Sequence, residues 1–325
     1  MTYADGPDPY AGLDTGVAHP ARVYDYWLGG TNNFPADREA AERVLAVTPG
    51  LRWRVRANRA FLARATRFLA GEAGIGQFLD LGTGIPGMGN THEVAQQVAP
   101  RARVVYVDND PIVARHAQAL LRGSPQGATD YLQADLREPE LIVDRAAGVL
   151  DFGQPVAVML FGVLHLIADA EDPWGIVARL MAAVPAGSYL AISHPALDTH
   201  QAQAAAQQAY NERVATPQTL RTREQVARFF TGLDLVEPGL VQVHQWRPDP
   251  DDEAPADAIS AYGAVGRKLR DRAFGGRRDA PITGNGNSRP ADYIGQCLLW
   301  WPAGHIRLPV DELCMSWWIT PATCG

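Results

Sequence analysis

The chain lacks cysteine over most of its length. Only three of its 325 residues are cysteines, and all three lie close to the C-terminal end: Cys297, Cys314 and Cys324. An odd number of cysteines at these spacings matches neither a paired disulfide framework nor a zinc-ligand pattern. We therefore expect no structural disulfide and no metal site.

Long apolar runs and an excess of positive charge are also lacking. The N-terminal residues have neither a basic segment nor an apolar core, so we expect no signal peptide. The longest apolar run, residues 155–168, is too short to span a bilayer and contains His165. The formal net charge is −7, which argues against general binding to nucleic acid or anionic membrane. These absences predict a soluble, cytoplasmic protein.

From residue 77 onward, short apolar segments alternate with helix-like segments. Strands are predicted at 77–81, 103–107, 129–133, 155–161 and 188–193, and helices near 90–98, 111–122, 138–148, 172–184, 201–210 and 224–230. Two further strands, 233–237 and 240–246, flank a Pro-Gly pair and are predicted to form a hairpin at the edge of the sheet. This alternation predicts an α/β fold, a doubly wound and mostly parallel sheet with helices on both faces.

A glycine turn follows the first predicted strand. Residues 78–87 read Phe-Leu-Asp-Leu-Gly-Thr-Gly-Ile-Pro-Gly, which places Asp80 at the end of the strand and glycines at 82, 84 and 87. Gly82 and Gly84 allow the backbone to approach a ligand closely. The same spacing fits the Gly-x-Gly-x-x-Gly pattern of a dinucleotide site, so an NAD-dependent oxidoreductase is the competing hypothesis.

Asp80 distinguishes the two hypotheses. A dinucleotide site brings a pyrophosphate to this turn, and a carboxylate two residues before the first glycine would repel it. S-adenosylmethionine has no phosphate, and a carboxylate attracts both its sulfonium and its α-ammonium group. We therefore interpret the turn as part of an S-adenosylmethionine site. A non-catalytic S-adenosylmethionine-binding protein remains a further alternative, because no residue is compelling as a catalyst.

Two more acids follow predicted strands. Asp108 ends the second strand and is placed to accept hydrogen bonds from both hydroxyls of a ribose. Asn109 beside it could border the adenine, and Asp135, after the third strand, is placed to accept from the adenine amino group. The full predicted cofactor-binding set is Asp80, Gly82, Thr83, Gly84, Asn90, Asp108, Asn109, Asp135, Leu136 and Phe161.

Longer segments resemble known methyltransferases. Residues 161–169 and 185–192 resemble the signature of the fourth and fifth strands in class I methyltransferases. Residues 20–38, 80–95 and 239–248 are similar to an actinobacterial S-adenosylmethionine-dependent methyltransferase family formerly grouped as a domain of unknown function. The resemblance covers about residues 18–268. It implies a seven-stranded, Rossmann-like class I fold that ends in an antiparallel strand, with S-adenosylmethionine as cofactor, but it implies no particular substrate.

The resemblance also suggests residues for the acceptor side. In several class I O-methyltransferases a histidine just after strand four removes a proton from the acceptor hydroxyl, and His165 occupies that place. An imidazole with a pKa near 6.5 suits this role; otherwise His165 orients the loop or a helix cap. His194 could also line the site. Four aromatic residues are predicted to form a lid that favours a small, partly apolar acceptor, or simply to pack the N-terminal helices: Tyr24, Tyr26, Trp27 and Phe34.

The sequence divides into four predicted segments. These are a flexible arm at 1–20, a helical cap at 21–70, the S-adenosylmethionine-binding domain at 71–268 and an atypical tail at 269–325. The helix predicted at 51–70 carries a row of arginines at positions 52, 56, 59, 64 and 67 opposite an apolar face. We expect these arginines to be solvated or ion-paired, and nucleic-acid binding to be unlikely.

Overall fold

The computed structural model describes most of the first 270 residues. The described residues are 14–48, 50–87, 89–120, 123–198, 211, 217–250, 252 and 260–270. The chain divides after Ala273 into two units, and all described residues belong to the first. The beginning of the predicted arm, the helix predicted at 201–210 and the tail after Arg270 lie outside the described residues.

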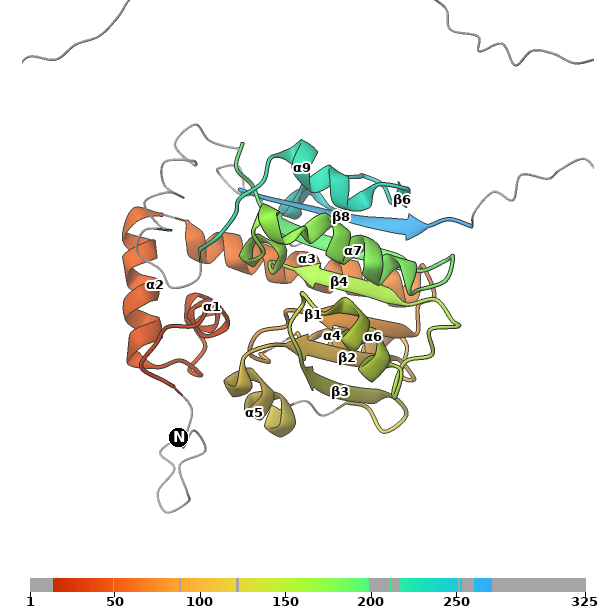
Figure 1. The fold of residues 1–325 in the computed structure, drawn as a ribbon, viewed down its shortest axis with the longest axis horizontal. Coiled ribbons are helices and arrows are strands. Elements are labelled where there is room, and N and C mark those ends of the chain that lie inside the picture. The colour runs from red at the N-terminus through yellow and green to blue at the C-terminus, as the bar shows by residue number, and fades with distance from the viewer. Residues whose placement is uncertain are drawn as a thin grey trace, which may run out of the picture. The chain divides into compact units, whose positions relative to one another are not determined.

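Eight strands form one sheet, which is seen in Figure 1. The strands are β1 Gln77–Leu81, β2 Arg103–Asp108, β3 Ala128–Gln133, β4 Ala157–Phe161, β5 Tyr189–Pro195, β6 Leu233–Leu235, β7 Val241–Gln242 and β8 Ala261–Lys268. Their order is β3-β2-β1-β4-β5-β8-β6, and β7 pairs with β8 on the same edge as β6. The eight strands thus fill seven positions, of which β1 to β5 are parallel and β8 is antiparallel to β5. The predicted fold class is confirmed.

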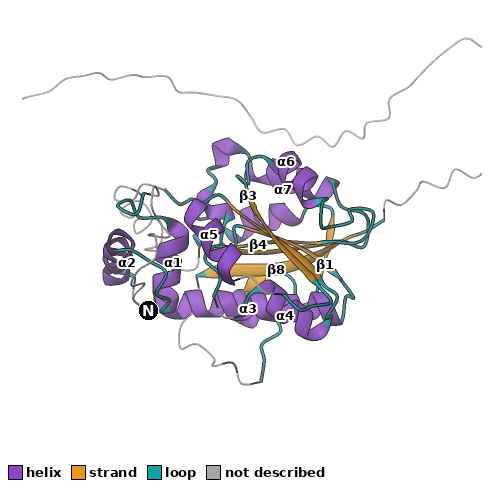
Figure 2. Cartoon of the chain, turned by 90° about the horizontal axis from the view of Figure 1, so that it is seen from below, coloured by secondary structure: helices purple, strands orange, loops and turns teal. Residues whose placement is uncertain are grey.

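Helices cover both faces of the sheet, with α3 and α4 on one side and α6 and α7 on the other (Figure 2). The helices are α1 Pro20–Leu28, α2 Pro35–Val47, α3 Leu51–Gly71, α4 Thr91–Val98, α5 Pro111–Leu120, α6 Pro139–Ala146, α7 Pro173–Ala182 and α9 Arg223–Ala227, and the short 3-10 turns are η1 Leu164–Leu166, η2 Asp169–Glu171, η3 Arg228–Phe230 and η4 Val243–Gln245. Successive strand residues point to opposite faces. Phe78 therefore joins the core beneath α3, while Leu79 joins the core beneath α6 and α7. None of the described helices combines the length and apolar character needed to cross a membrane.

The edge of the sheet differs from the predicted hairpin. The segments predicted as its two strands do not pair with each other, because β6 and β7 each pair with β8. Residues 243–245 form η4 instead of continuing a strand. β8 gives no alternating apolar pattern, because its glycines face aromatic rings. A Cβ atom on Gly263 would lie 2.5 Å from the Phe61 ring.

The arginine row of α3 departs from the expected solvated or ion-paired face at Arg64. Arg64 is buried, and its guanidinium donates hydrogen bonds to the backbone carbonyls of Val243 at 2.7 Å and Trp246 at 3.0 Å. It also pairs with Asp252 at 2.6 Å. Arg67 pairs with an acid of the same loop, as expected of an ion-paired face. The Arg64 side chain therefore fixes η4 against α3 and does not face solvent.

The first two helices form a cap with a small core of its own. Its buried residues are Val23, Trp27, Ala41, Leu51 and Val55. The polar residues of this N-terminal segment hold the connection between α1 and α2. The Asp37 carboxylate accepts from the backbone N–H of His19 at 2.9 Å and of Phe34 at 2.8 Å. The Asp25 carboxylate accepts from the backbone N–H of Asn32 at 2.9 Å. Many polar residues of segment 20–38, which resembles the methyltransferase family, therefore stabilise the structure of the cap.

Candidate active site

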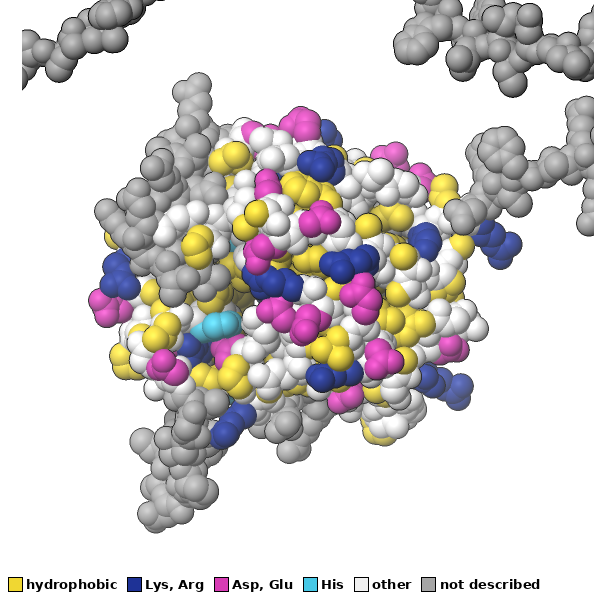
Figure 3. Space-filling model, in the orientation of Figure 1, with side chains coloured by type: hydrophobic (Ala, Val, Ile, Leu, Met, Phe, Trp, Pro, Cys, Tyr) yellow, Lys and Arg dark blue, Asp and Glu magenta, His cyan; other side chains and the backbone are white. Residues whose placement is uncertain are grey.

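A cavity of about 420 Å³ lies at the carboxyl ends of β1 to β4 and is bordered by α1, α2 and α3. The strand order reverses between β1 and β4, which is where open α/β sheets bind ligands. The space-filling view shows this face hollowed beside the cap, with a histidine side chain visible there (Figure 3). Of the predicted site residues, the following line the cavity: Asp80, Gly82, Thr83, Gly84, Asp108, Asn109, Asp135, Leu136, Phe161, Tyr24, Trp27 and His165.

The glycine turn after β1 adopts a backbone shape that requires glycine. Gly82 and Gly84 have positive φ angles of 70° and 63°, a region that residues with a Cβ rarely adopt. A Cβ on Gly82 would also lie 2.3 Å from the Val163 side chain. The corresponding atom on Gly84 would come no nearer than 3.9 Å to Ala21. Gly82 is therefore needed for packing, while Gly84 leaves room between the turn and α1.

Asp108 ties this turn to the end of β2. Its carboxylate accepts hydrogen bonds from the backbone N–H of Gly84 at 2.8 Å and of Asp110 at 3.0 Å, one on each oxygen. Burial raises the pKa of Asp108. Each carboxylate oxygen has a second lone pair, so the side chain can still accept from a ligand in the cavity.

Asp80 lies in β1, directly before the glycine turn, and its side chain is buried. Its carboxylate accepts a hydrogen bond of 2.6 Å from the Thr91 hydroxyl at the start of α4. Burial raises the pKa of Asp80 to about 6, although the Thr91 hydrogen bond and the charge of Arg59 lower it. The site therefore holds an acid that titrates just below neutral pH.

Asp135 lies at the rim of the cavity and is already ion-paired. Its carboxylate accepts from the backbone N–H of Arg137 at 2.9 Å and lies 3.2 Å from the guanidinium of the same residue. Arg137 in turn pairs with Glu171 at 2.6 Å. Any ligand that binds Asp135 must therefore share it with Arg137.

The cap contributes a fixed tyrosine to the cavity. The Tyr24 hydroxyl donates to the carbonyl of Val55 at 3.2 Å and accepts from the Asn58 amide at 3.0 Å. Burial raises the pKa of Tyr24, so the phenol stays protonated. Tyr24 thus lines the cavity as a neutral, positioned ring.

His165 lies in η1, directly after β4. Its Nδ1 atom is buried and has no hydrogen-bond partner among the described residues. Burial, together with the charges of Arg221 and Arg54, lowers the pKa of His165 to about 3. The imidazole is therefore neutral throughout the physiological range and can exchange hydrogen bonds with a ligand.

His194 lies behind His165 and takes no part in lining the cavity. Its ring is buried, and its Nε2 atom accepts a hydrogen bond of 2.8 Å from Arg221. Its proton is therefore on Nδ1, which donates to the carbonyl of Pro195 at 2.8 Å. Burial lowers the pKa of His194 well below its ordinary value. These contacts describe a neutral histidine that connects β5 with Arg221.

Three other predicted residues also lie outside the cavity. Asn90 is the N-cap of α4, and its side chain bonds the backbone N–H and C=O of Gly87 at 3.0 and 2.7 Å. The Tyr26 hydroxyl donates to the Glu42 carboxylate at 2.6 Å. Phe34 precedes α2, and the Arg22 guanidinium lies 5.5 Å from the centre of its ring. Each of these contacts belongs to the fold of the turn or of the cap.

Several cavity residues were missed by the sequence analysis. They are His19, Arg43, Asn58, Arg59, Arg137 and Gln218. Asn58 had a detectable signal, because it is a polar residue on the apolar stripe of α3 that includes Val55 and Leu62. His19 lies 3.0 Å from the carboxylate of Asp110, a contact between distant segments that no local pattern indicates.

Comparison with known proteins identifies a matching family and structural relatives of high sequence identity. Residues 8–269 match the family model for S-adenosyl methyltransferase. A DUF574 family protein from Streptomyces avermitilis is 46% identical, with a TM-score of 0.75 over 78% of this chain and 99% of that one. A protein from Thermobifida fusca, provisionally assigned as a methyltransferase, is 42% identical, with a TM-score of 0.72 over 80% of this chain and 98% of that one. No curated protein matches the chain.

Proposed function

The chain belongs to the S-adenosyl methyltransferase family, and from that premise we propose that it methylates a small-molecule acceptor in the cavity beneath its cap. As a member of the family it uses S-adenosylmethionine. The observation that carries the proposal is the placement of Asp80 and Asp108, which line the same cavity next to the glycine turn. When bound, S-adenosylmethionine supplies an electrophilic methyl group on a sulfonium.

The residues of the cavity fit this cofactor. Gly84 leaves open space toward α1, and this space can hold the amino-acid part of the cofactor. The Asp108 carboxylate is held by two backbone N–H groups, and its remaining lone pairs can accept hydrogen bonds from the ribose hydroxyls. Asp80 offers negative charge to the cationic part of the cofactor. The same negative charge disfavours a pyrophosphate. This charge and the family match both argue against an NAD-dependent oxidoreductase.

The remaining cofactor contacts follow from position in the cavity. Leu136 and Phe161 supply apolar walls, and Asn109 and Asp135 border the adenine end, with Asp135 shared between the ligand and Arg137. Thr83 lies between the two glycines. Tyr24 and Trp27 close the cavity from the cap. Tyr26, Phe34, Asn90 and His194 support these elements from outside the cavity.

Catalysis is proposed to rest on proximity and alignment. Holding two reactants in line can supply much of the rate of a transfer reaction. His165 is neutral and a weak base, because its pKa is lowered by burial and by Arg221 and Arg54. We propose that it holds the acceptor through a hydrogen bond and is too weakly basic to ionise a hydroxyl before the methyl group is transferred. A chain that binds the cofactor without methylating any acceptor is the alternative.

Calorimetry with S-adenosylhomocysteine and with NAD tests the proposal. We expect S-adenosylhomocysteine to bind and NAD not to bind. Asp108→Ala should weaken the S-adenosylhomocysteine complex, whereas the matched change Asp130→Ala, at an exposed acid on β3 outside the cavity, should not. Binding of NAD without binding of S-adenosylhomocysteine would overturn the assignment. Methyl transfer from labelled S-adenosylmethionine to a metabolite extract distinguishes the enzyme from the non-catalytic alternative.

A further inference from the structure

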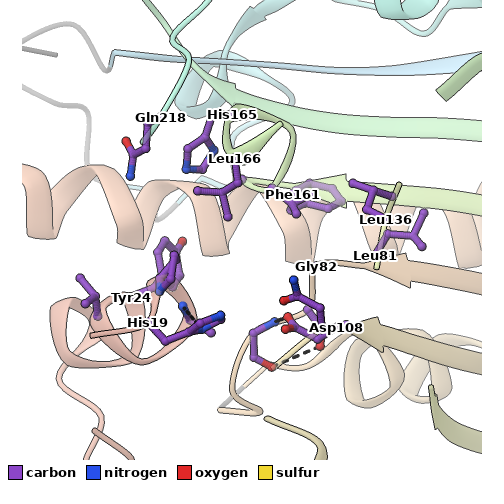
Figure 4. Close-up of a pocket in the computed structure, with 18 of the residues that line it drawn as sticks. His19, Tyr24, Leu81, Gly82, Asp108, Leu136, Phe161, His165, Leu166 and Gln218 are labelled. Atoms are coloured by element: carbon purple, nitrogen blue, oxygen red, sulfur yellow. Dashed lines mark hydrogen bonds between the residues drawn. The ribbon is translucent and has the colours of Figure 1, made fainter. Parts of the chain in front are cut away.

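One end of the cavity lies away from the acids that are proposed to hold the cofactor. In Figure 4 the side chains of His165, Leu166 and Gln218 lie across from Tyr24, while Asp108 and Gly82 lie further along. This end is formed by the cap, α3 and the loop after β4, and we call it the acceptor end. Its lining is partly apolar and includes Tyr24, Trp27, Asn58, Leu62, His165 and Leu166.

Two buried polar atoms at the acceptor end have no hydrogen-bond partner among the described residues. They are Asn58 Oδ1 and His165 Nδ1. Buried polar atoms in folded proteins are almost always hydrogen-bonded. Two such atoms on residues that line one cavity therefore point to groups that a ligand supplies.

The orientation of Asn58 is fixed by its neighbours. Its amide nitrogen donates to the Tyr24 hydroxyl at 3.0 Å, and that hydroxyl donates to the Val55 carbonyl at 3.2 Å. One N–H of the amide is engaged in this way, and the atom without a partner among the described residues is the oxygen, which can only accept. Asn58 also lies against the loop that carries His165, because a Cβ on Gly162 would be 3.5 Å from its amide nitrogen. A ligand at this point must supply an O–H or N–H hydrogen.

The charge around His165 restricts the ligand further. Arg221 is fully buried, pairs with the Asp169 carboxylate at 2.7 Å, and donates to the carbonyls of Leu164 at 2.9 Å and Ile167 at 2.8 Å, on either side of His165. Arg221 and Arg54 both lower the pKa of His165, after the larger effect of burial. Positive charge that disfavours an imidazolium here also disfavours a protonated amine. The acceptor end therefore suits a hydroxyl compound and disfavours a cationic amine.

We propose, as an extension of the methyltransferase function above, that the acceptor is a partly apolar molecule without positive charge, whose hydroxyl groups donate hydrogen bonds to Asn58 and His165. The oxygen that bonds His165 is the one methylated. Tyr24 and Trp27 pack against the apolar part of this molecule.

The transfer balances without a further reactant. A lone pair of the hydroxyl oxygen forms the new carbon–oxygen bond, and the carbon–sulfur bond of the sulfonium breaks with its electron pair left on sulfur. The hydroxyl proton passes to His165 Nδ1 and from there to solvent. A methylated oxygen that still carries its proton is a very strong acid, so even a weakly basic imidazole can take that proton.

Three aromatic probes of similar size separate the features of the proposal. Catechol has two hydroxyl donors, 1,2-dimethoxybenzene has the same skeleton and none, and benzylamine is cationic at neutral pH. Their binding is measured by calorimetry or ligand-observed NMR on protein saturated with S-adenosylhomocysteine. We expect catechol to bind at least tenfold more tightly than either of the other two. Equal binding of catechol and 1,2-dimethoxybenzene, or tighter binding of benzylamine, would overturn the proposal.

Variants then assign the effect to the two residues. Asn58→Leu and His165→Leu should each reduce the preference for catechol about tenfold while S-adenosylhomocysteine still binds. Thr66→Val is the matched control, because the Thr66 hydroxyl is also buried on α3 without a hydrogen-bond partner but does not line the cavity. It should leave the preference unchanged. An unchanged preference in both leucine variants would reject the assignment.

The two proposals fail in different ways. Loss of the methyltransferase proposal would appear as absent S-adenosylhomocysteine binding in the unmodified protein. Loss of the acceptor proposal would appear as normal S-adenosylhomocysteine binding without a preference for catechol. The comparison in the unmodified protein decides the second case even where a variant does not fold.

Discussion

At the scale of single residues, the buried acids have the clearest measurable consequences. Burial raises the pKa of Asp80 from its ordinary value of 3.8 to about 6. A carboxyl whose pKa is higher in the folded state contributes stability that is fully present below the unfolded pKa and is lost as the pH rises through the folded pKa. Asp80 therefore costs the cofactor-free protein about 3 kcal/mol at neutral pH, since each pKa unit is worth about 1.4 kcal/mol. Perturbed pKa values of this kind cluster at functional sites.

We expect the affinity for S-adenosylmethionine to rise with pH through about 6 and then to level off. The reason is that a cationic ligand favours the carboxylate form of Asp80, so protonation below that pH opposes binding. Calorimetry in a series of buffers between about pH 5 and 8 measures the binding constant at each pH. This range covers the titration of a carboxyl group with a raised pKa. The slope should be shallower for S-adenosylhomocysteine, which lacks the sulfonium, and should shrink in Asp80→Asn. A slope unaltered by Asp80→Asn would show that another group titrates.

Asp108→Ala should weaken binding of S-adenosylhomocysteine by about 1.5–3 kcal/mol, the usual loss for a charge-assisted hydrogen bond. Asp108→Asn should cost less than Asp108→Ala, because an amide oxygen can still accept from Gly84 N–H and keep the turn in place. Calorimetry on both variants measures the difference. An affinity equal to that of the unmodified protein in Asp108→Ala would exclude Asp108 as the ribose acceptor.

The sequence revealed the residues that follow a strand and missed those that reach the cavity from elsewhere. Asp80 and Asp108 could be predicted because each stands at the end of an apolar strand, and parallel strands bring their ends to one edge. Asn58 reaches the cavity from α3, and its role depends on contacts with Tyr24 that only the folded chain makes. Arg64 and Arg221 were not expected inside, because arginine is rarely fully buried unless carbonyls or acids receive its hydrogens.

At the scale of elements, the strand that sequence patterns missed is paired on both edges and packs against aromatic rings. β8 pairs with β5 on one side and with β6 and β7 on the other. Its glycines allow the Phe61 ring to lie against the strand. The alternation of apolar and polar residues that marks an ordinary strand is therefore lost. Four of the parallel strands, β1, β2, β4 and β5, were predictable because they are buried along almost their whole length and are rich in apolar residues, whereas β3 is only half-buried.

Gly263→Ala should destabilise the protein by about 1–3 kcal/mol, the usual cost of overpacking. The added methyl group would lie 2.5 Å from the Phe61 ring. It would have to be accommodated between β8 and α3, which pack against each other in the core. Urea unfolding measures the change. Gly76→Ala is the control, since a Cβ there meets nothing within 4 Å, and its effect should be small. Phe61→Leu should recover part of the loss in Gly263→Ala, and a simple sum of the two single effects would contradict the packing explanation.

At the scale of the whole molecule, the contacts of β8 explain where the fold of the family can end. The side chain of Lys268, the last residue of β8 and the single lysine of the chain, donates to the carbonyls of Met181 at 2.8 Å and Val184 at 2.9 Å. It thereby joins the sheet edge to the end of α7. The family match ends at residue 269. The Streptomyces avermitilis protein is covered over 99% of its length by only 78% of this chain.

A chain that ends at Arg270 should therefore fold and bind S-adenosylhomocysteine like the full protein. The tail after Lys268, which has no clear helical or strand periodicity, is predicted to be dispensable. A chain that ends at Ser260 is the matched comparison, because it loses β8, leaves β5 without its antiparallel neighbour and removes the pairing of β6 and β7. That shorter chain should fail to give a cooperative thermal transition. The four tryptophans of the tail provide the opposing hypothesis, because each large aromatic residue lost from a core costs about 3–5 kcal/mol. A large fall in the melting midpoint of the Arg270 chain relative to the full protein would mean that the tail packs on the fold and contributes to its stability.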